Sequence, residues 1–300
     1  MKEIINSNLK IIMAEIEVLQ PGLFSSIQDL GRFGYQKFGV PHSGVMDRYS
    51  MRICNMILGN PQETAVMEIT MQGPELKFSA SAYICICGAD ISPKVNSEEI
   101  PQDEIIEIKA GDILKFGGLR NGFRAYLGIR GGFTTKEVLG SKSWYEGITD
   151  EFRLKKGMLL EYDNRDFKDP DTFSALKTEL DYLDSREIEV YPGPEFEKLS
   201  PNQKEEFFNT DYTLDQSSNR MAVQFNQELP NDLEPIITAP VVPGTVQLTP
   251  SGKLIALMRD CQTTGGYPRI LQLSEKGIET IAQKRPGENI RFQKKEYPQL

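Results

Sequence analysis

One pattern of short strands and turns occurs twice in this 300-residue sequence, about 170 residues apart, and it constrains the fold more than any other feature. Residues 73–90 (GPELKFSASAYICICGAD) align without a gap to residues 243–260 (PGTVQLTPSGKLIALMRD). In the second stretch, residues 245–248 and 254–258 flank Pro250-Ser251-Gly252, which predicts a β-hairpin. The alternative is chance similarity, because short strand patterns recur freely.

Three further landmarks recur in the same order in the two parts of the chain. They are Ile16-Glu17-Val18 with Ile188-Glu189-Val190, Ser43-Gly44-Val45-Met46 with Ser218-Asn219-Arg220-Met221, and residues 111–116 with residues 287–292. The shared order favours an internal duplication, so we expect a mainly β protein with two related β modules and a few short helices. The expected parts are an N-terminal extension at 1–12, a first module at 13–165, a charged connector at 166–186 and a second module at 187–300.

The charge of the chain argues against one class of partner. The net charge is −9 and the pI is ≈ 5.0, whereas a nucleic-acid surface requires clustered Lys and Arg, and no such cluster stands out in the sequence. The apolar runs are too short to cross a bilayer or to form the core of a signal peptide. We therefore expect a cytoplasmic protein with no nucleic-acid or membrane partner.

The four cysteines predict neither a disulfide scaffold nor a metal site. Cys85 and Cys87 lie two positions apart in the apolar run YICIC, so both face one side of a strand, where small side chains suit a core. A metal site there would need further ligands, and the only histidine is His42. Cys261 adjoins a polar loop, but no histidine base is near it in the sequence, so a nucleophilic role is the less favoured interpretation.

The long segment 19–47 is rich in glycine and turn formers and lacks periodicity, which predicts an ordered functional loop or a set of short turns. Its candidate polar groups are Gln28, Asp29, Arg32, Ser43 and Asp47. Apolar spacing after Asp47 predicts a helix that ends at Gly59, and aspartate is favoured at a helix N-cap. Capping is therefore the favoured role of Asp47, although a cap beside a pocket can also take part in chemistry.

A second polar loop follows the expected hairpin, at residues 259–267. Its glycines, Gly265 and Gly266, allow positive φ and close approach of the backbone to a ligand. Together with Thr264, their N–H groups could form an anion-binding nest, whereas turn hydrogen bonds are the simpler role for Asp260 and the threonines. The sequence contains neither a dinucleotide-binding glycine fingerprint nor a P-loop, so an ATP site on this chain would be unconventional.

Several motifs taken together resemble one protein family. They are VLQPGLFSSIQDLGRFGYQKFGVPHSGVMD at 18–47, NMILGN at 55–60, GIRGGF at 128–133, LGSKS at 139–143 and PGTVQLTPSGKLIALMRDCQTTGGYPRI at 243–270. The family is that of KipA, also called the C-type subunit of 5-oxoprolinase, allophanate hydrolase subunit 2-like or carboxyltransferase subdomain A/B. This resemblance implies paired cyclophilin-like β-barrel modules. One departure is that the family pattern S-D-R-M-G reads Ser218-Asn219-Arg220-Met221-Ala222 here.

The resemblance implies a protein that works with partners. Family members act beside a KipI-like protein, the B-type subunit of 5-oxoprolinase, and together with an A-type subunit they convert 5-oxoproline to glutamate using ATP. ATP is thus expected at the level of the complex, and assembly into an oligomer of heterodimers is left open. Two alternatives remain, a biotin-dependent carboxyltransferase component, as in urea carboxylase, and a non-catalytic regulator that binds a KipI-like kinase inhibitor. The hydrolase is preferred because a separate subunit of this type resembles it most closely.

Opening a cyclic amide requires stabilisation of an oxyanion and a proton for the leaving nitrogen. We expect Asp47 and Asp260 to serve as acid or base, and Arg220 to pair with a substrate carboxylate. The expected substrate-binding residues are Ser43, Arg220, Gln262, Thr263, Thr264, Gly265, Gly266 and Tyr267. No metal ligand is expected.

Overall fold

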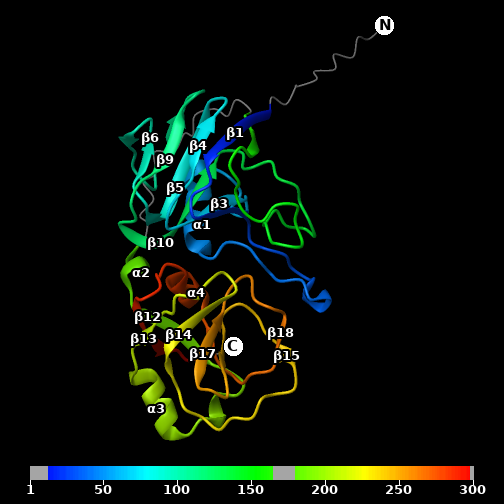
Figure 1. The fold of residues 1–300 in the computed structure, drawn as a ribbon, viewed down its shortest axis with the longest axis vertical. Coiled ribbons are helices and arrows are strands. Elements are labelled where there is room, and N and C mark those ends of the chain that lie inside the picture. Colours follow the sequence, from blue (N-terminus) through cyan, green and yellow to red (C-terminus); the bar gives the residue numbers. More distant parts are fainter. Residues whose placement is uncertain (1–12, 165–179, 298–300) are drawn as a thin grey trace.

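The computed structural model describes residues 13–164 and 180–297. They form two β-rich parts stacked along the long axis of the molecule, which we call the first half (13–164) and the second half (180–297) (Figure 1). The expected extension at 1–12, the last residue of the expected first module, 165, and most of the expected connector, residues 166–179, lie outside the described residues. The expectation of a mainly β fold with a few short helices is confirmed.

Two sheets form the first half and enclose one core. The strands are β1 (Met13–Gln20), β2 (Phe24–Gln28), β3 (Val66–Thr70), β4 (Glu75–Phe78), β5 (Ala82–Asp90), β6 (Pro93–Val95), β7 (Glu98–Glu99), β8 (Ile106–Ile108), β9 (Ile113–Phe116), β10 (Asn121–Ile129) and β11 (Leu159–Asp163). One sheet has the order β11-β1-β4-β9-β6-β7 and the other has the order β2-β3-β10-β5-β8. Alternate side chains of each strand, such as Ile84 and Ile86 on β5, enter the shared core because successive residues of a strand face opposite sides.

One large sheet dominates the second half. Its strands are β12 (Glu187–Pro192), β13 (Tyr212–Thr213), β14 (Ala222–Glu228), β16 (Thr245–Leu248), β17 (Lys253–Leu257), β19 (Arg269–Leu273) and β20 (Asn289–Lys294), in the order β13-β20-β12-β19-β16-β17-β14. A separate pair is formed by β15 (Ala239–Pro240) and β18 (Thr264–Gly265). Met46 of the first half packs into the core of the second half.

The helices follow the local signals in the sequence. They are α1 (Arg48–Leu58), α2 (Asp181–Asp184), α3 (Pro201–Asn209) and α4 (Glu275–Ala282), with 3-10 turns η1 (Gln36–Phe38) and η2 (Phe196–Lys198). Asp47 caps α1, as predicted, by accepting the Ser50 N–H at 3.0 Å, and Gly59 ends this helix in the left-handed conformation. Ser274 caps α4 in the same way. Side-chain oxygens at these positions satisfy N–H groups that the helix itself leaves unpaired.

The repeated sequence pattern forms equivalent strands in the two halves, but these strands pair differently. The predicted hairpin is confirmed, because β16 pairs with β17 in antiparallel register. Their counterparts in the first half, β4 and β5, lie in different sheets. Similar strand-and-turn sequences thus pair with different strands in the two halves, because pairing also depends on contacts with segments that are distant in the sequence.

Two expectations about loops require correction. Segment 19–47 contains a strand, β2, which pairs with β3 at the edge of the sheet, and its residues Ser25, Ser26 and Ile27 are buried. The polar loop at 259–267 contains β18, and neither Gly265 nor Gly266 is among the glycines with positive φ in the described chain. The absence of a side chain at Gly265 serves packing instead, because a Cβ there would lie 2.4 Å from the amide nitrogen of Gln247.

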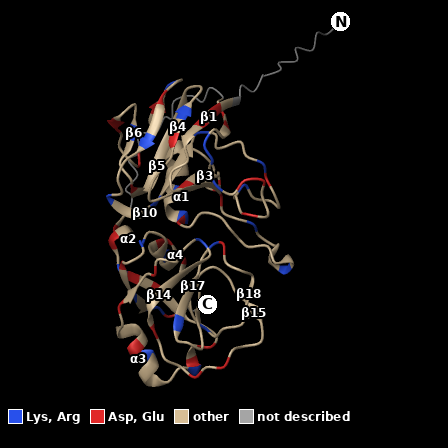
Figure 2. Ribbon diagram, viewed as in Figure 1, with Lys and Arg blue, Asp and Glu red and all other residues tan. Residues whose placement is uncertain are grey.

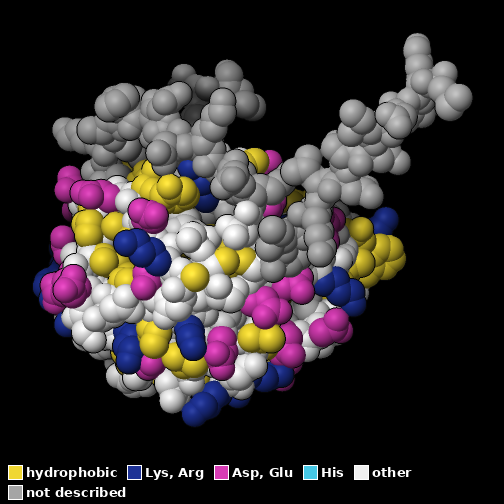
Figure 3. All heavy atoms as spheres, turned by 90° about the horizontal axis from the view of Figure 1, so that it is seen from above, with side chains coloured by type: hydrophobic (Ala, Val, Ile, Leu, Met, Phe, Trp, Pro, Cys, Tyr) yellow, Lys and Arg dark blue, Asp and Glu magenta, His cyan; other side chains and the backbone are white. Residues whose placement is uncertain are grey.

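Charged side chains of both signs are interspersed over the two halves (Figure 2). The end of the molecule formed by the first half likewise carries acidic, basic and hydrophobic side chains side by side (Figure 3). Within residues 13–164 and 180–297, the helices are all too short or too polar to cross a membrane.

A single glutamine connects the two halves through four hydrogen bonds. Gln283, which follows α4, accepts from the N–H groups of Phe123 and Arg124 at 3.0 and 2.9 Å. Its amide nitrogen donates to Asp47 at 2.7 Å and to the Arg124 carbonyl at 2.9 Å. Gln283 is 1 % exposed, so these polar groups have no access to water and depend on one another.

We expect the substitution Gln283→Leu to lower the free energy of unfolding by about 3 kcal/mol, because it leaves two backbone N–H groups and Asp47 without this partner. Urea unfolding measures the change. The control is Gln62→Leu, because the side chain of Gln62 is exposed. Equal stability of the two variants would contradict the role of Gln283.

Glu279 on α4 makes the stability of the folded chain depend on pH. Burial, Asp47 and Glu275 raise the pKa of Glu279 to about 7, although Arg259 opposes the shift. The unfolded chain loses this proton near its ordinary pKa, whereas the folded chain keeps it to near pH 7, so the group destabilises the fold as the pH rises between these values.

The substitution Glu279→Gln removes this penalty. We expect the difference in free energy of unfolding, variant minus parent, to be larger at pH 8 than at pH 5 by about 1–3 kcal/mol. The magnitude follows because one unit of pKa shift corresponds to about 1.4 kcal/mol. Thermal unfolding at both pH values measures the difference, with Glu205→Gln at an exposed position as the control. A gain that is independent of pH would contradict the assignment.

Candidate functional site

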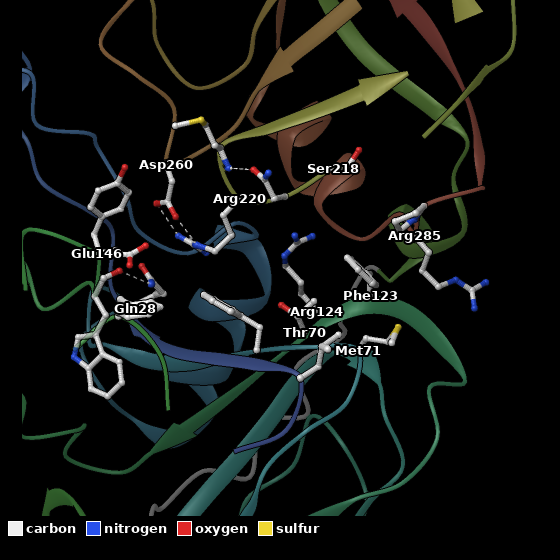
Figure 4. A pocket seen from close by; sticks show the side chains of 18 of the residues that line it. Gln28, Thr70, Met71, Phe123, Arg124, Glu146, Ser218, Arg220, Asp260 and Arg285 are labelled. Carbon is white, nitrogen blue, oxygen red and sulfur yellow. Dashed lines mark hydrogen bonds and ion pairs between the residues drawn. The ribbon is translucent and has the colours of Figure 1, made fainter. Parts of the chain in front are cut away.

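A cavity of ≈ 710 Å³ lies between the two halves and is lined by both of them. Its apolar wall comes mostly from the first half and comprises Leu23, Phe24, Met71, Phe123, Trp144, Tyr145 and Phe152, with Met221 and Pro286 from the second half. Its charged lining groups are Arg124, Glu146, Arg220, Asp260 and Arg285. In Figure 4, Arg220 and Asp260 face each other on one side, Arg124 lies beside them, and Glu146 and Arg285 lie at opposite ends. Concave sites with apolar walls and a few polar groups are typical binding sites for small molecules.

Arg220 and Asp260, both expected in the site, form an ion pair in the cavity wall. The Nε atom of Arg220 donates to one carboxylate oxygen of Asp260 at 2.7 Å, and Nη2 donates to the other at 3.1 Å. Nη1 of Arg220 also donates to Glu68 of the first half, and Nη2 donates to the Gly44 carbonyl at 2.7 Å. The guanidinium thus has at most one N–H left for a ligand, because four of its donor contacts are internal.

Electrostatics keep this guanidinium charged. Burial lowers the pKa of Arg220, but the carboxylates of Asp260 and Glu68 outweigh that effect and raise the pKa above its ordinary value. Glu68 is itself fixed by the Met46 N–H at 2.7 Å. Arg220 therefore holds the two halves in register as well as lining the cavity, and its predicted contact with a substrate carboxylate stays a prediction.

Arg124 is a second buried arginine in the lining of the cavity. Its Nε is buried and has no hydrogen-bond partner, while Nη1 donates to the Ala282 carbonyl. The closest carboxylate oxygen to Nε belongs to Glu68 and lies at 3.8 Å. Burial lowers the pKa of Arg124, and Glu68 opposes this shift. A buried N–H without a hydrogen-bond partner costs free energy, and the nearby Glu68 carboxylate offsets part of this cost.

The structure places Asp47 outside the lining of the cavity. Its side chain is fully buried and accepts from Tyr182 at 2.6 Å, from Gln283 at 2.7 Å and from the Ser50 hydroxyl at 2.8 Å. Burial raises the pKa of Asp47, although these hydrogen bonds oppose the shift. Because its oxygens face protein donors rather than the cavity, Asp47 serves the junction of the halves and has no part in our proposed mechanism.

The predicted loop residues also lie apart from the cavity. In the described chain, the lining does not include Gln262, Thr263, Thr264, Gly265, Gly266 or Tyr267. Thr264 and Gly265 pair with β15, and beside this pair the Val241 N–H donates to the Thr263 carbonyl at 3.1 Å. Without positive φ at the two glycines, the expected anion nest is not formed, and that prediction is wrong for this conformation.

Ser43 belongs to a group of buried polar side chains near the cavity. Its backbone has a φ of 57°, an unusual value for a residue other than glycine, and its hydroxyl has no partner. Arg32 is 0 % exposed, and its Nε and Nη1 are also without partners. Its remaining nitrogen donates to the Ser143 carbonyl, directly before the cavity residue Trp144. Burial lowers the pKa of Arg32, while Asp29 and Asp260 oppose the shift.

Several cavity residues carry no signal in the sequence. Arg124 and Phe123 lie within a strand, and Trp144 and Tyr145 lie in an irregular segment, so neither spacing nor motif singles them out. Asn219, which departs from the family pattern, lines the cavity and accepts from the N–H groups of Met221 and Ala222 at 2.8 and 3.2 Å. An aspartate could make the same turn hydrogen bonds, so the replacement preserves the local backbone.

Comparisons with known proteins agree with this architecture. The chain is 30% identical over 292 residues to the C subunit of 5-oxoprolinase from Haemophilus influenzae, covering 93% of this chain and 90% of the relative. It is 29% identical to the C subunit of 5-oxoprolinase from Escherichia coli, covering 92% of this chain and 90% of that protein. Against urea amidolyase of Saccharomyces cerevisiae it is 32% identical over 92% of this chain, but it covers only 16% of the relative.

Solved structures show the same fold. The protein TTHA0988 matches with a TM-score of 0.82 and 25% identity over 93% of this chain, and the urea amidolyase of Kluyveromyces lactis matches with a TM-score of 0.82 and 30% identity over 93%. This chain spans about half the length of the TTHA0988 chain, 55%, and 18% of the urea amidolyase chain. The family model described as carboxyltransferase domain, subdomain A and B, matches residues 38–294. The chain therefore belongs to the family of carboxyltransferase domains, subdomain A and B.

Proposed function

We propose that this chain is one subunit of an ATP-dependent 5-oxoprolinase, which hydrolyses 5-oxoproline to glutamate, and that it acts beside a KipI-like B-type subunit and an A-type subunit. The similarity to two proteins named as C subunits of 5-oxoprolinase supports this choice, because the chain covers 90% of each. The observation that carries the proposal for this chain's own role is the cavity between the halves, whose lining contains Arg124, Arg220 and Arg285.

The cavity chemistry suits a small cyclic amide with a carboxylate. Arg285 lies at one end of the cavity, where its guanidinium can bind the substrate carboxylate. The ring methylenes of the substrate would pack against Phe123 and Met71. Asp260 is held by Arg220 and retains lone pairs for one more hydrogen bond, which the amide N–H can donate.

In the proposed reaction, water adds to the amide carbonyl carbon, the C–N bond breaks, and the released nitrogen takes a proton. This chain binds and orients the cyclic amide, and Asp260 fixes the nitrogen that becomes the amine. ATP is required at the level of the complex, and we assign its binding to the assembled subunits rather than to a motif of this chain.

A second candidate function is carboxyl transfer from carboxybiotin to an amide such as urea. The identity of 32% to urea amidolyase and the family model favour it. Both functions place an amide in the same cavity, but they differ in the second reactant. Incubating the complex with a carboxylated biotin carrier and urea tests this alternative. Formation of carboxylated urea, together with no release of glutamate from 5-oxoproline, would favour carboxyl transfer.

The test of the proposed hydrolase uses this chain co-purified with its B-type and A-type partners. We expect the substitution Arg285→Ala to raise the KM for 5-oxoproline by about 10- to 100-fold, because a charge-assisted hydrogen bond contributes about 1.5–3 kcal/mol. The readout is ATP-dependent release of glutamate, measured over a range of 5-oxoproline concentrations.

The matched control is Arg291→Ala. Arg291 is as exposed as Arg285, with side chains 50% and 46% exposed, and each forms one ion pair with an acidic neighbour. Arg291 is not among the residues that line the cavity. An intact complex that leaves 5-oxoproline untouched, or equal kinetics of the two variants, would contradict the proposal.

A further inference from the structure

Three cysteines meet on the side of the first half that α1 covers. Cys85 and Cys87 lie on β5 and face the helix, while Ile84 and Ile86 between and beside them face the opposite core. Cys54 comes from the middle of α1 and packs against both. The sequence placed two thiols on one face of a strand, and the fold supplies a third from a different element.

The three sulfur atoms are close enough to share one ion. All three Sγ atoms lie within 4.8 Å of one another, and the Sγ atoms of Cys85 and Cys87 are 3.6 Å apart. Thiolates bound to zinc at about 2.3 Å in tetrahedral geometry are about 3.8 Å apart, so this spacing needs little change. Cys54 reaches the cluster because residue 128 is glycine, where a Cβ would lie 2.6 Å from the Cys54 sulfur.

An acidic side chain lies beside the three thiols. The N–H of Asp103 donates to the carbonyl of Ile86, which lies between the two strand cysteines, at 2.9 Å. The Asp103 carboxylate interacts with the Cys87 thiol, and its Oδ1 atom is buried and has no hydrogen-bond partner. An unpartnered carboxylate oxygen next to a thiol cluster is costly in an apolar region, and a bound cation would satisfy it.

We propose that Cys54, Cys85 and Cys87 bind a single thiophilic metal ion, with Zn²⁺ the best matched. We propose further that Asp103 supplies the fourth ligand once its side chain turns toward the sulfur atoms, because its oxygens lie outside the 4.8 Å grouping of the three thiols. Three thiolates and one carboxylate form a donor set that suits Zn²⁺, which takes four sulfur, nitrogen or oxygen ligands without preference from d electrons. Three buried thiolates with a fourth protein ligand form a closed set, which is typical of a structural site rather than a catalytic one.

Binding at this site is coupled to proton release and to folding. The Cys54 thiol donates to the Cys85 carbonyl at 3.3 Å, and the ion replaces this proton, as it replaces those of the other two thiols. Because α1 and β5 contribute ligands together, the ion would link the helix to the sheet. None of the four proposed ligands lines the cavity between the halves, so this site is independent of the proposed hydrolase function.

The test uses the full chain, produced in zinc-supplemented medium, purified under reducing conditions and dialysed against EDTA. We expect one zinc per chain by elemental mass spectrometry and a higher Tm than for protein unfolded and refolded with chelator. Refolding with Co²⁺ should produce the sulfur-to-metal charge-transfer absorption and the strong visible bands of a tetrahedral thiolate site. The single variants Cys54→Ser and Cys87→Ser should lose the metal, while circular dichroism verifies that they fold.

Cys261→Ser is the matched control, because Cys261 is also a buried free cysteine but lies outside the cluster. It should retain one zinc. Folded parent protein without metal after refolding in Zn²⁺, or metal retained by the Cys54 and Cys87 variants, would overturn the proposal. A disulfide between two of the three cysteines under the same reducing conditions would also overturn it. Asp103→Asn should weaken zinc affinity at least tenfold, and an unchanged affinity would remove Asp103 from the ligand set.

Discussion

The buried guanidinium of Arg220 is the interaction on which the arrangement of the two halves depends. It donates to Asp260 of its own half and to Glu68 and the Gly44 carbonyl of the other. A buried charge that loses its partners costs several kcal/mol, so the halves cannot shift without exposing or unpairing this group. Asp47 and Gln283 form a second buried polar junction alongside it. The repeated segments Ser43–Met46 and Ser218–Met221 thus meet each other across the contact between the halves.

The cavity follows from this junction. Its charged groups come from both halves, and two of them are held by the bonds that keep the halves together. Arg220 is held by Glu68, and the backbone of Arg124 is held by Gln283. Sites between domains or modules are common because two surfaces can enclose a ligand that one surface cannot. The consequence for mutagenesis is that Arg220 is a poor probe of substrate binding, whereas Arg285 at the cavity end reports on the ligand with less effect on the fold.

The sequence predicted two residues of the cavity lining but not most of the others. Arg220 and Asp260 do line the cavity, and Asp47 is the helix cap that its position indicated. The glycine pair at 265–266 was misinterpreted, because glycine can be required by close packing as well as by positive φ, and here Gln247 occupies the space where a side chain would be. The sequence did not predict that Cys54 lies near Cys85, because the two residues are 31 positions apart and belong to a helix and a strand.

Residues close together in the sequence were sufficient to predict the β-rich class, the hairpin at 245–257 and the helix cap at Asp47, and short motifs were sufficient to identify the family. These features depend on residues within a few positions of one another, where alternation and capping act directly. The separation of β4 and β5 into two sheets, the cavity and the three-cysteine cluster arose only from the folded arrangement. Such features depend on which distant segments pack together, and packing is decided by the simultaneous burial of apolar area and satisfaction of buried polar groups across the whole chain.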